Sequence, residues 1–312
     1  MKVKYQHYKP NQGLEEIRAK IYTKATGLSA NADQIRIQAE GQDPKLMRFA
    51  FNEEGEPLAY ISASGGDFEP WSIGMGYPWA LPGCPKEVQE TIFEDLFGYL
   101  KRQKKIQEIY TNVSYQNKIY KEQLRFFFEK GFTEKERYFV SDRDLEVKEV
   151  AKWGLTKEIK ALKARKATPK DRDALIELCL SDPQTRGAFP TREAWVSYFD
   201  DRVLKADHAV MVFKGSKLVA ASAPLRFKPD GVFLTAKGER IIMRFTGIRP
   251  GHTYAWKRLL IEVAKECVTA KWTDIPLRVR WGISTSAYAA PTLMPKDSEF
   301  KESGIVLFYT KR

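Results

Sequence analysis

A strand, a sharp break and a helix follow one another between residues 240 and 272, and this order can hold a phosphate group. The apolar run at 241–248 predicts a strand, and Arg249-Pro250-Gly251 ends it. A helix begins near Tyr254, and its apolar face has helical spacing: Trp256, Leu260, Val263, Ala264 and Cys267. Because the first turn of a helix has free N–H groups, such a break aims several donors at one point.

Nine residues around this break are the candidate ligand contacts. They are Thr246, Gly247, Ile248, His252, Thr253, Tyr254, Ala255, Trp256 and Lys257. The first three could pair with a ligand through the strand backbone, and Lys257 could meet a phosphate charge beside the positive end of the helix dipole. The same residues also fit an ordinary strand end and a solvent-facing helical turn, so both interpretations stay open.

The other reactive side chains form no recognisable catalytic or metal-binding pattern. The three histidines lack metal-ligand spacing, so we expect no metal. The three cysteines lie far apart, which favours a reducing cytoplasm over disulfides or a zinc cluster. Cys179 and Cys267 fit a core, whereas Cys84 lies near a predicted helix start that could lower its pKa. Tyr288 and Tyr309 could act as a general acid, but no residue can be assigned as the base.

The composition is that of a globular chain with a basic surface. The 312 residues suggest two domains, and no apolar run approaches the roughly 20 residues of a membrane span. The N-terminus has no apolar signal core, so we expect neither secretion nor a membrane. The net charge of +12 fits nucleic acid, an acidic surface or a phosphorylated cofactor. Because the lysines are spread along the chain, nucleic acid is the less favoured partner.

The predicted elements occur twice in the same order. Each half consists of a strand, helix, hairpin, strand, break, helix, strand, helix and strand. Gly55 and Gly215 lie in the two hairpin turns, and the breaks at Pro78 and Pro250 follow in step. We therefore predict an α/β (α+β) fold with two mixed sheets, each flanked by helices. The predicted division is a first domain at 1–145, a linker at 146–158 and a second domain at 159–312.

Short motifs in both halves are similar to those of one family. Thr246-Gly247-Ile248-Arg249-Pro250 is similar to "T-G-V-x-P", and Phe128-Glu129-Lys130-Gly131-Phe132 is similar to "Y-E-K-x-G-F". Phe300-Lys301-Glu302-Ser303-Gly304-Ile305 is a weaker counterpart of the second motif. With the order of elements, they make the chain resemble two tandem copies of the GNAT fold, the family of acetyl-CoA-dependent N-acetyltransferases.

Three features depart from the pattern of that family. Its phosphate-binding turn reads Arg/Gln-x-x-Gly-x-Gly/Ala, whereas His252-Thr253-Tyr254-Ala255-Trp256 lacks the arginine and the glycines. In the first copy, Pro82 and Pro85 each remove an amide donor. The family's tyrosine acid would fall near Phe127 or Phe300, and neither can donate a proton.

The resemblance implies acyl transfer from acetyl-CoA to an amine of a small molecule or peptide, with the cofactor in the C-terminal copy. The resemblance also implies a polar cofactor contact at Asn112. Five aromatic residues near the breaks could line an acceptor pocket or belong to the core: Trp71, Tyr77, Trp79, Trp256 and Trp281. The alternative is a non-catalytic protein of this fold that binds nucleic acid or another acidic partner. A tandem aminoacyl transferase of the peptidoglycan type is a third possibility, but its usual long helical insertion does not occur here.

Overall fold

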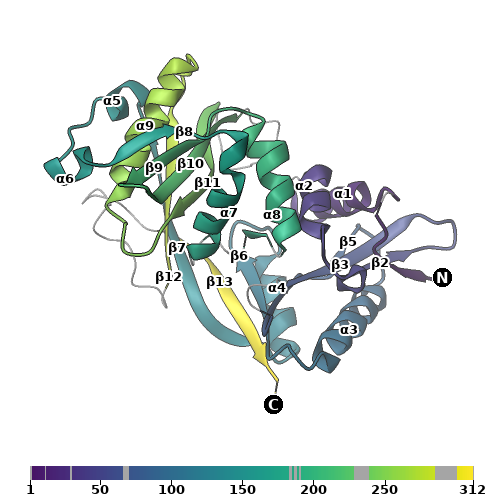
Figure 1. Ribbon diagram of the computed structural model, residues 1–312. Helices are drawn as coiled ribbons and strands as arrows, with labels where there is room; N and C mark the ends of the chain where they lie inside the picture. The colour runs from purple at the N-terminus through teal and green to yellow at the C-terminus, as the bar shows by residue number, and fades with distance from the viewer. Residues whose placement is uncertain are drawn as a thin grey trace.

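Figure 1 shows the computed structural model, which describes residues 2–311 with gaps at residues 11, 29, 66–69, 183–184, 186–187, 190, 228–238 and 285–300. The first half contains β1 (Lys4–His7), α1 (Leu14–Thr26), α2 (Ala32–Ala39), η1 (Pro44–Leu46), β2 (Met47–Phe51), β3 (Pro57–Gly65), β4 (Ser72–Met75), β5 (Trp79–Ala80), α3 (Lys86–Arg102), β6 (Glu108–Ser114), α4 (Tyr120–Glu129) and β7 (Thr133–Leu145). The second half contains α5 (Val147–Ala151), α6 (Lys157–Lys160), β8 (Lys163–Lys166), η2 (Pro169–Asp171), α7 (Arg172–Ser181), α8 (Arg192–Tyr198), η4 (Phe199–Leu204), β9 (Val210–Lys214), β10 (Lys217–Phe227), β11 (Arg240–Ile248), α9 (Ala255–Thr269), β12 (Leu277–Ser284) and β13 (Lys301–Thr310).

The two predicted mixed sheets are present and are joined edge to edge. The described strands form a 13-stranded sheet in the order β1-β2-β3-β4-β6-β13-β7-β12-β11-β10-β9-β8, with β5 beside β3. Each half contributes one parallel pair, β4 with β6 and β11 with β12. The prediction of a duplicated α/β arrangement with mixed pairing is therefore confirmed.

The last strand of the chain makes this join. β13 lies between β6 and β7 and is antiparallel to both, so the C-terminus returns to the first half (Figure 1). β7 in turn pairs with β12 of the second half. The sequence predicted β13 as the closing strand of the second half, but its neighbours are both strands of the first. The predicted division of the chain into two domains at residues 146–158 stays a prediction. The sheet continues across this division, because β7 pairs with β12.

A glycine permits the insertion of β13. A Cβ added at Gly304 would collide with the Val113 carbonyl oxygen and with the Tyr138 ring, so a side chain does not fit there. The sequence at 295–302, followed by Gly304, predicts a short helix. Residues 295–300 lie outside the described part, and Lys301 and Glu302 belong to β13 instead.

Helices cover both faces of the sheet in each half (Figure 1). In the first half, α3 and α4 pack on one face and α1 on the other. In the second half, α9 and α5 pack on one face and α7 and α8 on the other. Ile305 and Leu307 of β13 are buried in the same cluster as the apolar face of α3, so the first core is completed by the last strand.

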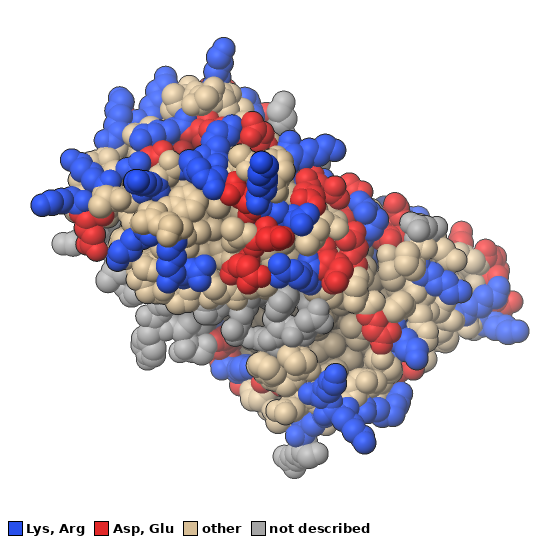
Figure 2. Space-filling view, in the orientation of Figure 1, with Lys and Arg blue, Asp and Glu red and all other residues tan. Residues whose placement is uncertain are grey.

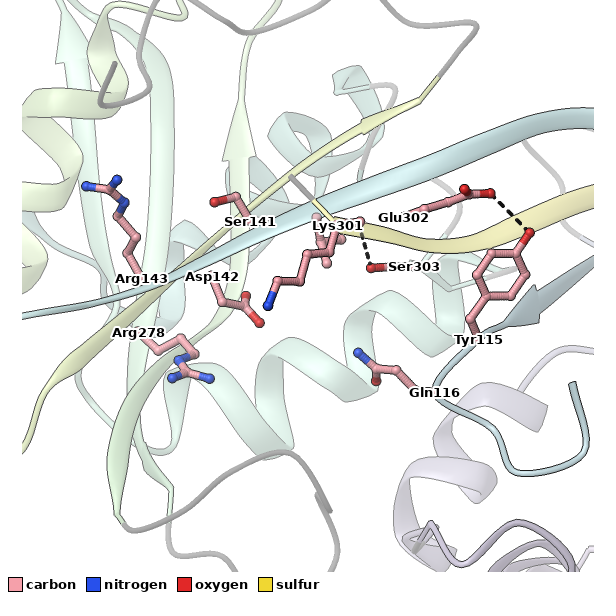
Figure 3. Close-up of a pocket in the computed structure, with 10 residues that line it drawn as sticks. Tyr115, Gln116, Ser141, Asp142, Arg143, Arg278, Lys301, Glu302 and Ser303 are labelled. Carbon is pink, nitrogen blue, oxygen red and sulfur yellow. Dashed lines mark hydrogen bonds between the residues drawn. The ribbon is translucent and has the colours of Figure 1, made fainter. Parts of the chain in front are cut away.

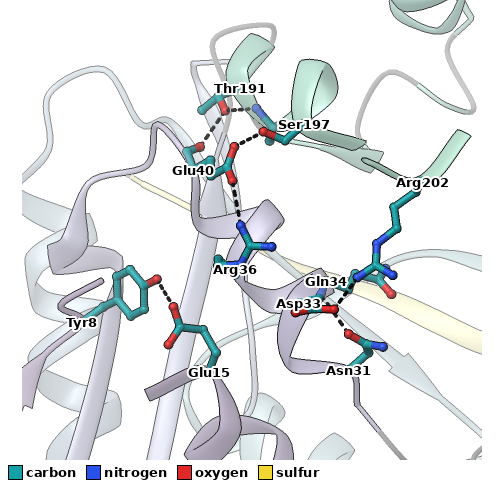
Figure 4. A network of polar contacts seen from close by, with 11 residues as sticks. Tyr8, Glu15, Asn31, Asp33, Gln34, Arg36, Glu40, Thr191, Ser197 and Arg202 are labelled. Carbon is teal, nitrogen blue, oxygen red and sulfur yellow. Dashed lines mark hydrogen bonds and ion pairs between the residues drawn. The ribbon is translucent and has the colours of Figure 1, made fainter. Parts of the chain in front are cut away.

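A second contact joins the halves through α2. Ile37 of α2 is buried in the core that α7 and α8 form. Beside it, Thr191 donates to the Glu40 carbonyl oxygen at 2.7 Å, and Arg202 pairs with Asp33 at 2.8 Å (Figure 4). The halves are thus held together at the helices as well as through the sheet.

Most predicted elements agree with the structure. Apolar residues at helical spacing predict helices at 14–26 and 86–102, and α1 and α3 have these bounds; Gly27, predicted to end the first helix, has a φ of 75°. Thr168 before Pro169 predicts an N-cap, and Thr168 forms a capping box with Asp171. The polar residues 28–45 predict irregular structure, but they contain α2, whose 8 residues give too short an apolar period to recognise.

Replacing Leu307 by alanine should destabilise the first half, although the residue belongs to the last strand. Its side chain is fully buried there, so we expect the free energy of unfolding to fall by about 2–5 kcal/mol. Urea denaturation followed by circular dichroism measures this change. The exposed Thr310 is the control, and Thr310→Ala should change stability by less than about 0.5 kcal/mol. Equal stability of the two variants would contradict the insertion of β13.

Candidate functional site

β11 and β12 are parallel neighbours only where they begin. Their one register pair is Ile241↔Leu277. Beyond this pair the two strands separate, since β12 stays paired with β7 and β11 stays paired with β10. Beyond that pair, the edge of β11 that faces β12 has no strand beside it among the described residues. A free strand edge of this kind can pair with an extended ligand.

A β-bulge lies in β11 beside this opening. The register with β10 shifts between Ser222 and Pro224, so that Arg244 and Phe245 oppose one residue. Ser222 donates to the Phe245 carbonyl oxygen at 2.6 Å, and Tyr198 donates to that of Arg244 at 2.9 Å. Because a bulge bends and twists its strand, it fits the divergence of β11 from β12.

The predicted strand-end contacts Thr246, Gly247 and Ile248 form the end of β11. A Cβ added at Gly247 would lie 3.2 Å from Leu178 Cγ, so close packing against α7 favours glycine here. The Ile248 N–H donates to the carboxylate of Asp182 at 3.0 Å, and Asp182 is 8% exposed. The sequence analysis missed Asp182, because no pattern links the end of α7 to the end of β11.

The predicted break before the long helix is a turn followed by an uncapped helix start. His252 N–H donates to the Arg249 carbonyl oxygen at 3.0 Å, and Gly251 has a φ of 79°. Tyr254 is the N-cap of α9 and makes no capping bond with its side chain. The N–H groups of Gly251, Thr253 and Tyr254 have no acceptor among the described residues. These donors and the helix dipole together favour an anion.

The side chains at the start of α9 divide into buried and accessible ones. Ala255 and Trp256 are 0% and 8% exposed and pack in the core under α9, so they fix the helix rather than face a ligand. Thr253 is exposed and Lys257 is partly exposed. The structure thus brings the nine predicted residues to one strand end and one helix start, where their binding role stays a prediction.

The β9–β10 hairpin adds basic side chains to this helix start. Lys214 and Lys217 flank its turn, and Lys214 Nζ lies 5.8 Å from the centre of the Tyr254 ring. Burial lowers the pKa of His252, and the charges of Lys217, Lys214 and Arg249 lower it further. His252 is therefore neutral at pH 7, and the cations around it give the helix start a positive potential. The sequence predicted the hairpin but not this meeting of its lysines with α9.

The corresponding region of the first half is built differently. The Tyr77 ring, which follows β4, packs against Phe126 and Phe127 of α4 with centroid distances of 5.2 and 6.2 Å. Pro85 is the N-cap of α3 and has no N–H. The hairpin turn at 52–56 carries three glutamates where the second half has two lysines. Aromatic packing, proline and negative charge all disfavour an anion in the first copy.

The other candidate side chains do not join the second-half site. Tyr309 lies in β13 among strands of the first half, so it is excluded as an acid beside α9. Burial raises the pKa of Cys84, so the lowering that a nearby helix start could cause does not occur. Asn112 is exposed in β6. Tyr288 and Phe300 lie outside the described residues.

The five aromatic residues near the two breaks do not form one pocket. Trp79 and Trp256 are each 8% exposed and belong to two different cores. Tyr77 packs against the first core, whereas Trp71 is 50% exposed. The side chain of Trp281 lies outside the described part.

A cavity of about 650 Å³ lies where β7, β12 and β13 meet (Figure 3). Asp142 in its wall is bonded to Arg280 at 2.7 and 2.8 Å, and this arginine lowers the pKa of Asp142. Lys301 also lines the cavity and has no ion-pair partner among the described residues. Both halves contribute to the lining, so this polar cavity depends on the pairing of β7 with β12 and β13.

No group of three His, Cys, Asp or Glu side chains in the described ranges is arranged to hold a metal ion. The described helices include none with the length and apolar character that crossing a membrane requires.

Solved structures with a similar fold include one tandem GNAT protein. The chain aligns over 99% of its length with 98% of a tandem GNAT protein from the clavulanic acid biosynthesis pathway, with a TM-score of 0.60 and 8% identity. It aligns over 99% with 95% of a GCN5-related N-acetyltransferase from Sphaerobacter thermophilus, with a TM-score of 0.58 and 13% identity. A third match, over 99% of this chain and 73% of the other, is a probable N-acyltransferase of unknown function from Enterococcus faecalis, with a TM-score of 0.63 and 10% identity.

The chain therefore has the GNAT fold in two tandem copies, as its sequence predicted. No protein-family model matches the sequence, and no curated protein matches it. At these identities the likeness establishes the fold alone, because one fold can carry different functions.

Removing the Asp182 carboxylate should destabilise the second half. Asp182→Ala leaves the Ile248 N–H without its acceptor, so we expect the free energy of unfolding to fall by about 1–3 kcal/mol. Asp200→Ala is the control, because it breaks only the accessible pair with Arg172 and should cost less than about 1 kcal/mol. Urea denaturation compares the two variants. A gain in stability from Asp182→Ala would contradict its structural role.

Proposed function

We propose that the protein is an acyl-CoA-dependent N-acyltransferase whose second half binds acetyl-CoA as the acyl donor. The observation that carries the proposal is the start of α9, where open backbone donors meet the cations Lys214, Lys217 and Arg249. Coenzyme A combines phosphates with a long arm that contains amides. An anion site followed by a free strand edge matches both parts.

The residues present fit the proposed cofactor even though most glycines of the family's turn are missing. The space around Gly251 is open, so a phosphate can approach the backbone there. The N–H groups of Thr253 and Tyr254 would donate to it, and Lys257 would add charge. The β11 edge from Thr246 to Ile248 would pair with the amides of the arm.

The proposed reaction joins an amine nitrogen to the acyl carbon and breaks the carbon–sulfur bond. The attacking amine loses a proton and the leaving thiolate gains one, so the site needs a proton acceptor and a proton donor. We assign Asp182 as the candidate acceptor, since its buried carboxylate lies at the end of β11. Because Asp182 holds the Ile248 N–H, that amide can polarise the acyl carbonyl only when the carboxylate shifts.

The proposed acceptor is an amine of a small molecule or peptide, and the cavity between the halves is its candidate pocket. Lys301 could bind an acidic group of the acceptor, and Asp142 could bind the amine of the acceptor in its protonated form. The first domain, at 1–145, would shape this pocket beside the second, at 159–312. The three cysteines are free, in keeping with a proposed cytoplasmic location. The open site in the second half gives the catalytic proposal more support than the non-catalytic alternative.

Reversing the two hairpin charges should weaken the binding of acetyl-CoA. Lys214→Glu/Lys217→Glu replaces attraction by repulsion at the start of α9, so we expect affinity to fall by about tenfold or more, equivalent to about 1.4 kcal/mol. Isothermal titration calorimetry measures this. Lys20→Glu/Lys24→Glu makes the same change of charge on α1 and should bind like the parent.

Two results would contradict the proposed site. One is equal affinity of the hairpin variant and the α1 variant, which would place any binding elsewhere. The other is no binding by the parent at ligand concentrations of about 1 mM. Release of free thiol from acetyl-CoA in the presence of amino-acid and peptide amines then tests acyl transfer itself.

A further inference from the structure

A basic segment lies outside the proposed acyl-transfer site. Lys101-Arg102-Gln103-Lys104-Lys105 places four cations in five residues at the end of α3. Figure 2 shows basic side chains gathered at the end of the molecule where Figure 1 places the C-terminus. The lysines are spread along most of the chain, and this segment is a local exception.

A groove of about 600 Å³ lies beside this segment. Arg102, Lys104 and Lys105 line it, and none of these three cations has an ion-pair partner among the described residues. Asp43 is the acidic residue in the described lining, and the Tyr99 hydroxyl is bonded to it. The described lining of the groove therefore carries three cations against one carboxylate.

An exposed tryptophan belongs to the chain segment that passes the groove. Trp71 is 50% exposed and lies between Pro70 and Ser72, which line the groove. Its carbonyl oxygen accepts the N–H groups of Gln107 and Glu108 at 2.7 and 3.0 Å, which ties it to the chain that follows the basic segment. An exposed ring beside cations is the combination that stacks a base while phosphates are neutralised.

The last residues of the chain hold the basic segment in position. Lys311 N–H donates to the Gln107 carbonyl oxygen at 3.1 Å, and the Lys311 ammonium donates to that of Gln103 at 2.6 Å. The segment is thus fixed at two points before any ligand arrives. A preorganised site loses less conformational entropy on binding than a free loop does.

We propose that this groove binds single-stranded nucleic acid, with Arg102, Lys104 and Lys105 on phosphates and Trp71 stacked on a base. The stacking residue favours a single strand, because the bases of a duplex are already stacked on one another. A membrane surface fits less well, because binding to it requires an exposed apolar helix face and α3 buries its own. The binding is separate from acyl transfer and does not depend on it.

Fluorescence anisotropy with labelled oligothymidylate of about twelve nucleotides tests the proposal. Three phosphate contacts predict a slope of about −2 for the logarithm of affinity against the logarithm of salt concentration. Lys104→Gln/Lys105→Gln should reduce the slope to about −0.7. Lys157→Gln/Lys160→Gln removes the same charge from exposed positions in α6 and should leave affinity close to that of the parent.

The role of Trp71 has its own test. Trp71→Ala should weaken binding by about 5- to 150-fold, whereas Trp71→Phe should keep most of the affinity because a ring remains. An oligomer of the same length without bases should bind the parent and Trp71→Ala equally. Thermal melting by circular dichroism checks that each variant is folded.

Several results would overturn the proposal. They are no binding by the parent at about 50 mM salt, equal binding by the groove variant and the α6 variant, and equal affinity of the parent for oligomers with and without bases. Binding to anionic phospholipid vesicles without binding to oligothymidylate would also overturn it and would point to a membrane. Since none of these variants touches α9, acetyl-CoA binding is measured independently of the outcome.

Discussion

The pairing of β13 with β6 and β7 holds both halves of the chain in one sheet. It buries Ile305 and Leu307 in the first core, while β7 pairs with β12 of the second half. The cavity between the halves and the position of the basic segment depend on the same pairing. Lys301 at the start of β13 lines the cavity between the halves, and Lys311 after its end fixes the basic segment. Contacts between residues so distant in sequence raise the contact order of the first half, which is associated with slower folding.

The duplication has produced two copies with the same order of elements and opposite properties at the helix start. In the second copy, β11 separates from β12 after one pair, and lysines approach the start of α9. In the first copy, Tyr77 packs on α4, Pro85 removes a donor, and the hairpin turn is acidic. Both helix starts have a dipole, but open donors and basic charge favour an anion in the second copy, whereas the first copy has fewer donors and an acidic hairpin turn. This contrast is the physical basis for proposing that the second half binds the cofactor.

The sequence predicted those features that depend on local pattern. The apolar period of α3, the αL glycine after α1 and the Pro-Gly break before α9 are all properties of neighbouring residues. It could not predict the place of β13, because apolar alternation predicts a strand but not its neighbours. Asp182 beside Ile248 and Lys214 beside Tyr254 depend on how distant elements pack. The predicted contacts Ala255 and Trp256 were named for their position, but their side chains face the core.

Hydrogen exchange with and without acetyl-CoA tests the central claim most directly, because it reads both copies in one experiment. We expect slower exchange for the backbone amides of Gly251, Thr253 and Tyr254, which have no acceptor among the described residues. We expect no change at 82–88, the start of α3. Protection at the start of α3, or binding of acetyl-CoA without protection at the start of α9, would contradict the account.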